Sequence, residues 1–560
     1  MSSSSSGHKS ANQAPDMPLS PARHMTEYDR RSVFFCSLPA LILSAVCLLP
    51  YLNKAFTIDD PFFLLQAQQI RVRPLHPLAF DMCWMDDAVC GPVAGGGLMP
   101  GNISFLMSYC LVPIASRAEP ERLVHLMQIV ALWFGIAATV SLAFRFGFGS
   151  FAASAAGLLV AATPPVLAMA STAMPDILAM SLGVIGIARV VAWKTTGKTI
   201  DGVVGGLALG LAPLARVHFV LLWLVAAVFL RDDAQIFDPR SWIALPWRRW
   251  IPLIFAFLVC LAALILTHEP GSLAPTHTWY VRPGNIHHNL HSYLTYWILA
   301  MPLGLAWLIL RKNLVRFWLL AIGVGLPVIW EILIRHAPVI WTTLCAGVGA
   351  VVLIDVLLWS FRSRHQWRIA CALWLLIPLV ALPYYQVTVK YLVACAPAAA
   401  LLVAGLLPAY RWRIAVLCGI VAFGAIFGSM VLRADAQFAE MGRQAATQLI
   451  TPRTATGHRV WFASQWGFYW YALKAGGQVL RGNDVPASGD YLVRGTMEGY
   501  LGTLKRLPPA VQIETFTVGG PGGRTMSAKD GAGLYSNNFG DLMWAWGTGE
   551  WNHYELWRFQ

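Results

Sequence analysis

Seven polar residues in four short segments could carry chemistry in this otherwise apolar chain. They are Asp59 and Asp60, Asp176, Arg216 and His218, and Lys390 and Tyr391. A carboxylate can take a proton from an incoming hydroxyl, and basic side chains can bind a phosphate group. Together they would suit a transfer reaction on an anionic substrate that is carried by a lipid.

Each of these residues also has a simpler explanation. Asp59 and Asp60 follow an apolar run, and acidic residues at the end of a membrane span can be solvated caps. Asp176 lies in the first turn of a predicted helix, where a carboxylate is stabilised by the helix macrodipole. Arg216 and Lys390 could extend from apolar stems to the membrane surface. A shared location is what would favour a shared role.

The elements that must position these residues are predicted to be membrane-spanning helices. The 560 residues are 57% hydrophobic and only 12% charged, and the apolar residues fall in runs of about 18 to 22. The formal net charge is +13, but the arginines and lysines cluster between the apolar runs. They indicate topology, and no nucleic-acid partner is expected.

The basic residues predict which side of the membrane each segment faces. Arg30 and Arg31 precede the first run, 33–52, so the N-terminus is expected in the cytoplasm and Asp59 outside. Further spans are predicted at about 122–144, 150–170, 174–193, 251–268, 291–310, 315–333, 338–359, 369–382, 390–408 and 412–431. With a hairpin over 202–230, broken at Pro213, this makes about 13 crossings with the C-terminus outside.

Changes in composition along the sequence divide the chain into three parts. Residues 1–30 are predicted to be a disordered tail, 31–432 the transmembrane part, and 433–560 a small soluble α/β domain. The outer loop 53–121 is expected to hold a juxtamembrane helix at 102–115. In the C-terminal part the pattern predicts strands at 459–462, 491–493 and 554–559 and a helix at 466–474.

No cofactor is expected from the sequence. Five histidines lie between residues 268 and 291, but their spacing matches no common metal site, so a divalent metal is the lesser alternative. Cys83 and Cys90 share a polar loop. They could form a disulfide if the loop faces an oxidising compartment, and two free thiols are the alternative.

Several of these segments together resemble a known family. They are the acidic pair after the first span, Pro74-Leu75-His76-Pro77 in the outer loop, Met174-Pro175-Asp176 at the head of a span, and Val389-Lys390-Tyr391-Leu392 before a late helix. In order and topology, residues 30–430 are similar to the multi-span GT-C glycosyltransferases. The likeness is greatest to bacterial glycosyltransferase family 39, which is related to protein O-mannosyltransferases and the lipid A aminoarabinose transferase.

The resemblance implies an enzyme of the bacterial inner membrane whose active site and C-terminal domain face the periplasm. The donor would be a hexose or pentose linked to polyprenyl phosphate, and the acceptor a hydroxyl of a glycan, lipid or protein. Asp59 would be the general base, with Asp60 where many relatives carry Glu. Asp176 would match a second carboxylate that orients the acceptor or sugar. Lys390-Tyr391 stands where many relatives have Arg-Tyr, so phosphate would meet a point charge without the bidentate fork.

The main alternative is a membrane transporter or flippase for a lipid-linked or anionic substrate. Broken helices and intramembrane charges also serve substrate pathways, and transporters tend to show matching breaks in their two halves. The sequence indicates one clear break, near Pro213, and no partner in the second half. An O-antigen ligase or polymerase would carry its large functional loop later in the chain. The enzyme is therefore the favoured hypothesis.

Overall fold

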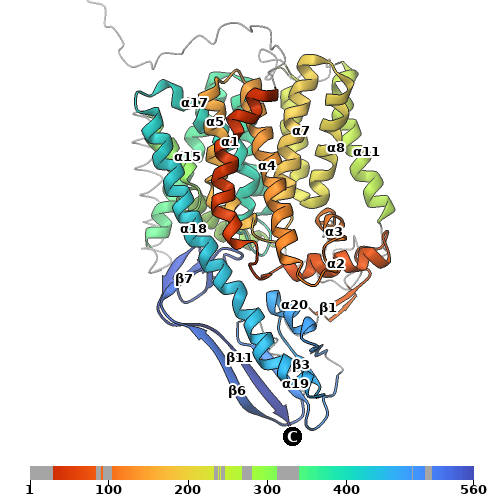
Figure 1. Ribbon diagram of the computed structural model, residues 1–560. Helices are drawn as coiled ribbons and strands as arrows, with labels where there is room; N and C mark the ends of the chain where they lie inside the picture. Colours follow the sequence, from red (N-terminus) through yellow and green to blue (C-terminus); the bar gives the residue numbers. More distant parts are fainter. Residues whose placement is uncertain are drawn as a thin grey trace, which may run out of the picture.

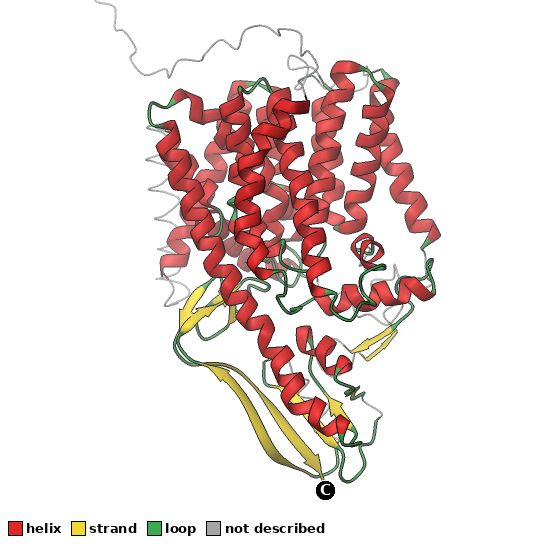
Figure 2. Cartoon of the chain, viewed as in Figure 1, coloured by secondary structure: helices red, strands yellow, loops and turns green. Residues whose placement is uncertain are grey.

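The computed structural model describes residues 30–83, 90–92, 104–231, 238, 240, 246–267, 281–311, 340–481, 484–497 and 507–560. Most helices form a bundle at one end of the molecule, and the strands lie at the opposite end (Figures 1 and 2). Residues 1–29 of the tail predicted at 1–30, and the span predicted at 315–333, lie outside the described residues.

Within the described residues, seven helices are long and apolar enough to cross a membrane. They are α1 (Arg30–Leu48), α4 (Glu121–Arg145), α7 (Asp176–Thr196), α11 (Ile251–Leu266) with the preceding turn Trp247–Trp250, α15 (Ile340–Ser363), η9 (Val389–Cys395) continued by α17 (Ala396–Leu406), and α18 (Arg413–Ala445). An eighth candidate is a pair of helices, α12 (Ile286–Leu299) and α13 (Pro302–Leu310), bent by 68°. The predicted polytopic helical architecture is confirmed.

Shorter apolar helices complete the bundle. They are α5 (Ser150–Ala161), α6 (Pro164–Met169), α8 (Thr199–Ala215), the turn η2 (Val217–Leu221) with α9 (Leu222–Leu230), and α16 (Gln366–Trp374) with the turn η8 (Ile377–Ala381). Each is shorter than the roughly 20 residues that an upright span requires. The described residues therefore hold seven or eight candidate spans, and the figure of about 13 crossings stays a prediction.

The predicted hairpin is present. At one end of it, Arg216 bonds to Asp176 at the start of α7. At the other end, Lys194 near the end of α7 donates to the carbonyl of Arg231. Helix α8 therefore runs antiparallel to α7, and α9 returns parallel to it. The break was predicted at Pro213, which is wrong: Pro213 lies within α8, and the chain breaks at the extended Arg216, beside the first turn of α7.

The loop after α1 contains more helix than expected. Helix α2 (Asp60–Val72) begins at the acidic pair, lies across the lower end of the bundle, and is followed by the short helix α3 (Leu106–Leu111) (Figure 1). Pro61 occupies the first turn of α2, where its missing N–H costs nothing. Two short strands, β1 (Asp81–Cys83) and β2 (Cys90–Pro92), pair in the same loop.

The C-terminal region is a mixed sheet with a small helix. Its five-stranded sheet has the order β4 (Gln478–Val479), β3 (Val460–Phe462), β5 (Tyr491–Gly495), β11 (Glu550–Phe559) and β6 (Ala510–Gly519). The strands predicted at 459–462, 491–493 and 554–559 are confirmed, as is the helix at 466–474, which is α20 (Trp466–Lys474). The other short elements of this region are α19 (Thr451–Ala455), β7 (Gly522–Arg524), β8 (Met526–Ser527), β9 (Ala532–Gly533) and β10 (Ala545–Gly547).

Helix α18 connects the two regions without interruption. Its 33 residues run out of the bundle and into the strand region, through the predicted domain boundary at 433 (Figure 1). The sheet is therefore attached to the bundle by a continuous helix, and the division into 31–432 and 433–560 stays a prediction.

Candidate active site

The first carboxylate of the acidic pair meets a lysine from the far end of the sequence. Asp59 Oδ2 lies 2.9 Å from Lys390 Nζ, and the two side chains are 21% and 6% exposed. Asp59 is the N-cap residue of α2, whereas Lys390 lies in η9, which packs against α6 and α7. The bundle thus brings together an acid and a base that are separated by 331 residues.

The backbone just before Asp59 is in an unusual conformation. Ile58 has a φ of 36°, in the left-handed region that a β-branched residue rarely adopts. Such strain persists only where the surrounding structure holds it, and it is most common at functional sites. Here it accompanies a tight turn in which the amide of Asp60 donates to the carbonyl of Thr57 at 2.9 Å.

A second ion pair lies beside the first. The guanidinium of Arg216 bonds Asp176 through both nitrogens of its fork, Nε to Oδ1 at 3.1 Å and Nη2 to Oδ2 at 2.7 Å. Asp176 heads α7, and Arg216 is extended at the hairpin break, so the break delivers the guanidinium to the head of α7. Arg216 also interacts electrostatically with Asp59, which places both pairs in one cluster.

His218 and Tyr391 join this cluster through their rings. Their centroids lie 5.4 Å apart in an edge-to-face arrangement. The Tyr391 hydroxyl interacts with the charges of Lys390 and Arg216. All the predicted site residues except Asp60 therefore surround one location.

Asp60 faces away from this cluster. Its side chain is fully buried and accepts two backbone N–H bonds, from Thr57 at 2.9 Å and from Ala173 at 2.8 Å. Burial raises the pKa of Asp60 to about 7, and the nearby Lys54 and the two amides lower it by less. Asp60 ties the loop after α1 to the turn that precedes α7, which is a structural task.

The structure adds three residues that sequence reasoning missed. Lys54 and Asp435 form an ion pair in which both side chains are fully buried, and Tyr535 donates to Asp435 at 2.7 Å. Lys54 also donates to the carbonyl and hydroxyl of Ser171, at 3.0 and 3.2 Å. A signal was present in the position of Lys54, five residues before Asp59, but its partner lies 381 residues away.

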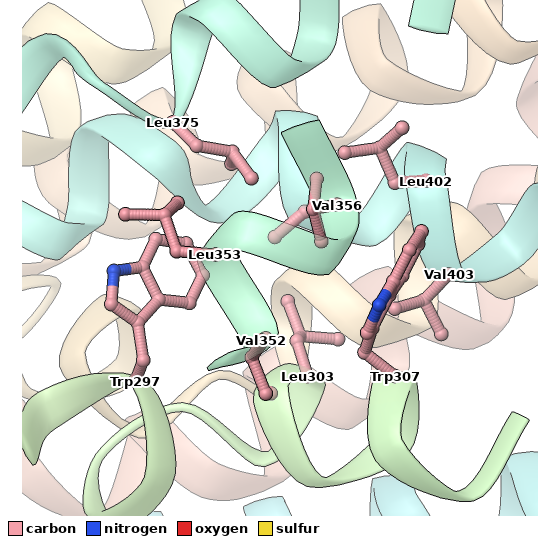
Figure 3. Close-up of a pocket in the computed structure, with 11 residues that line it drawn as sticks. Trp297, Leu303, Trp307, Val352, Leu353, Val356, Leu375, Leu402 and Val403 are labelled. Atoms are coloured by element: carbon pink, nitrogen blue, oxygen red, sulfur yellow. The ribbon is translucent and has the colours of Figure 1, made fainter. Parts of the chain in front are cut away.

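A small apolar pocket with a cavity volume of about 20 Å³ lies elsewhere in the bundle (Figure 3). Trp297 and Trp307 face it from the bent pair α12 and α13, and Leu353 and Leu402 from α15 and α17. None of the residues that line the pocket is charged. It is separate from the polar cluster and does not contribute to it.

Within the described residues, no three His, Cys, Asp or Glu side chains are grouped as a metal site would require. Two of the five histidines noted in the sequence, His268 and His277, lie outside the described residues. Of the others, His291 Nδ1 is 3.2 Å from Asp541 Oδ2. The expectation that no cofactor is needed therefore stays a prediction.

The sequence and the structure were both compared with known proteins. No family model matches the sequence, and no curated protein matches it. The structure is similar to those of GT-C membrane glycosyltransferases.

The first of these is ArnT from Cupriavidus metallidurans bound to undecaprenyl phosphate, with a TM-score of 0.43 and 14% identity over 88% of this chain and 96% of ArnT. The Archaeoglobus fulgidus oligosaccharyltransferase gives a TM-score of 0.40 at 14% identity, covering 80% of this chain and 62% of that one. The mycobacterial arabinofuranosyltransferase AftD gives 0.41 at 16% identity, covering 96% of this chain and 40% of AftD. At these scores the likeness is one of general arrangement, and the chemistry must be argued from the site itself.

Proposed function

We propose that this protein is a membrane glycosyltransferase that moves a sugar from a polyprenyl-phosphate-linked donor to an acceptor hydroxyl. The observation that carries the proposal is the meeting of Asp59 with Lys390, beside the pair formed by Arg216 and Asp176. A carboxylate and two cations at the end of a helical bundle are the groups needed to accept a proton and to bind a phosphate.

In the reaction the acceptor hydroxyl attacks the anomeric carbon of the donor sugar. A new glycosidic C–O bond forms, and the bond between the anomeric carbon and the phosphate oxygen breaks. The electron pair of that bond leaves with polyprenyl phosphate, and the hydroxyl proton passes to the Asp59 carboxylate. One displacement inverts the anomeric configuration, and a positioned base of this kind contributes roughly 10²- to 10⁴-fold.

The ion pair between Lys390 and Asp59 suggests how the donor would engage. Lys390 Nζ donates to Asp59 Oδ2 at 2.9 Å. When a phosphate binds Lys390, that bond is exchanged, and the Asp59 carboxylate is released to accept a proton. The base would therefore become free only when the donor is bound.

Arg216 is the second candidate ligand for the phosphate. Its bonds to Asp176 use only two of the five N–H donors of the guanidinium. With both of its oxygens bonded to Arg216, Asp176 is better suited to holding this arginine than to orienting the acceptor. His218 and Tyr391 would line the same phosphate site.

The transporter hypothesis needs one correction. The sequence indicated a single break, but α12 and α13 form a second one, with a bend of 68° in the second half of the chain. Ala300 and Met301, which lie at this bend, are apolar and fully buried. A broken helix on a substrate pathway presents polar groups there, so the second break gives a transporter no support.

The proposal places the site at the outer face of a bacterial inner membrane, where polyprenyl-linked donors and envelope acceptors would meet. Val217, at the hairpin tip, is 51% exposed. A cysteine at this position is expected to react with an impermeant thiol reagent added from outside to intact spheroplasts. Reaction only after the membrane is opened would reverse the orientation.

The chemistry is tested with the purified protein and a set of undecaprenyl-phosphate-linked hexoses and pentoses. Asp59→Asn is expected to abolish release of undecaprenyl phosphate while the protein still inserts in the membrane. The matched control is Asp81→Asn, which changes a half-exposed carboxylate in the same outer loop and should leave turnover unchanged. Full turnover by Asp59→Asn would refute the proposal.

A further inference from the structure

One loop of the C-terminal region reaches into the bundle beside the candidate site. We call residues 534–541, which follow β9, the docking loop. Its shape is fixed by two turn bonds, from the amide of Phe539 to the carbonyl of Ser536 and from the amide of Gly540 to the carbonyl of Asn537, both 3.1 Å. Three of its side chains, those of Tyr535, Asn537 and Asp541, bond to the bundle.

The first contact leads to the segment that carries Asp59. Tyr535 donates to Asp435 on α18, and Asp435 forms the buried ion pair with Lys54. Lys54 holds Ser171, and two residues later the amide of Ala173 bonds Asp60. The hydroxyl of Tyr535 thus supports the ion pair that fixes both sides of the Asp59 loop.

The second contact leads to the segment that carries Lys390. Asn537 donates to Asn289 Oδ1 and to Ser292 Oγ on α12, each at 2.9 Å, and its own Oδ1 accepts from the amide of Val387 at 3.2 Å. The same amide donates to Asn289 Oδ1 at 3.1 Å. Val387 lies three residues before Lys390. Asn537 thus fixes the segment just before Lys390 through buried hydrogen bonds.

Asp541 anchors the end of the loop. It accepts from Ser292 Oγ at 2.5 Å and lies 3.2 Å from His291. Burial raises the pKa of Asp541, but the bonds from His291 and Ser292 outweigh burial and keep this pKa below its usual range, so the anchor stays charged at neutral pH. Asp541 therefore anchors one end of the docking loop. Its other two bonded side chains contact two different segments: Tyr535 contacts α18, and Asn537 contacts α12 and Val387.

We propose that Tyr535 and Asn537 are positioning residues, through which the docking loop fixes the separation of Asp59 and Lys390. The inference rests on the proposed function, because it assigns these two residues to the base and to the phosphate ligand of that reaction. Tyr535 acts through Asp435 and Lys54 on the base. Asn537 acts through Val387 on the phosphate ligand.

The two contacts predict two different kinetic effects. Asn537→Ala removes three buried bonds near Lys390, and should weaken binding of undecaprenyl phosphate about five- to tenfold while changing kcat by less than about threefold. Tyr535→Phe removes only a hydroxyl. It should lower kcat about five- to tenfold, because misplacing a base is costly, and leave lipid binding within about twofold of the wild type.

Asn538→Ala is the matched control. Asn538 is the next residue of the docking loop and is exposed, so the same substitution there should change neither kcat nor binding of undecaprenyl phosphate. All variants are made in the full chain, and binding is followed by titration with undecaprenyl phosphate. If Asn537→Ala does not accumulate in the membrane, Tyr535→Phe alone tests the inference through its separate effects on kcat and lipid binding. Deletion of one hydroxyl preserves the packing of the ring, so this variant is expected to fold.

The inference is overturned if both variants behave like Asn538→Ala, or if both change kcat and lipid binding in parallel. A purely structural role would give that parallel loss, whereas the split requires separate positioning. These failures differ from a failure of the proposed function. In that case Asp59→Asn would retain turnover, whatever the docking-loop variants do.

Discussion

The buried ion pair between Lys54 and Asp435 allows the most quantitative prediction. Both side chains are fully buried, and the pair joins the Asp59 loop to α18. Lys54→Met leaves the Asp435 charge without its cation, and Asp435→Asn leaves the Lys54 charge without its anion. Removal of one partner of such a pair costs about 3–5 kcal/mol, mainly because the other charge stays buried.

The double variant should recover most of this loss. With Lys54→Met and Asp435→Asn combined, neither charge of the pair remains, and the amide oxygen of the asparagine can still accept from Tyr535. The coupling free energy of the cycle is therefore expected to be about 2 kcal/mol or more. The exposed pair of Arg481 and Asp81, which are 54% and 48% exposed, is the control, and its cycle should give about 0–1 kcal/mol.

The assay is unfolding in detergent for the wild type, the two single variants and the double variant, read as free energies from the same denaturant series. The single variants are expected to be the least stable proteins in the cycle. A double variant that is the least stable, because the two effects add, would refute this prediction, as would a coupling free energy no larger than that of the exposed pair.

Three further predictions concern the site and its loop. Lys390→Ala should weaken binding of undecaprenyl phosphate about tenfold more than Lys390→Arg, because the arginine keeps the charge; equal affinities would exclude a phosphate role. Asp60 binds its proton more tightly in the folded state, because its pKa is about 7 there against an ordinary 3.8. The free energy of unfolding should therefore fall by up to about 4 kcal/mol between pH 4 and 7 and then level off. Asp60→Asn should show no such fall. Cys83 and Cys90 are backbone partners in the β1–β2 register, and a thiol count under non-reducing conditions is expected to find them paired; two titratable thiols would contradict this.

The features that the sequence predicted well are those with a local signal. Apolar runs and the arginines between them predicted the seven long helices and the hairpin, because lipid demands continuous apolar helices and charge fixes their ends. In the C-terminal region the apolar run at 491–493 and the helical pattern from Trp466 predicted the strand and the helix. Each of these signals is contained within about 20 residues of the chain.

The features that it missed depend on distant partners. Lys54 resembles an interfacial charge until Asp435 is seen beside it, 381 residues away. Asp59 and Asp60 are adjacent and chemically alike, and only the turn at Ile58 decides that one meets Lys390 while the other is buried. No periodicity carries such information.

Helix α2 was missed for a different reason. Its glutamines, among them Gln66 and Gln68, interrupt the apolar pattern, so the segment was predicted to be loop. A helical signal was nevertheless present in Pro61 at the first turn and in apolar residues at helical spacing. Gln66 is buried and accepts from the hydroxyl of Ser108 on α3 at 2.6 Å, a contact that only the folded loop supplies.

The central claim is tested most directly in cells. In a bacterium that lacks this protein, mass analysis of the envelope glycans should show the loss of a single sugar unit from one class of glycan, lipid or protein. The wild-type chain should restore that mass, and Asp59→Asn, produced at the same level in the membrane, should not. An unchanged set of masses in its absence, or restoration by Asp59→Asn, would contradict the assignment.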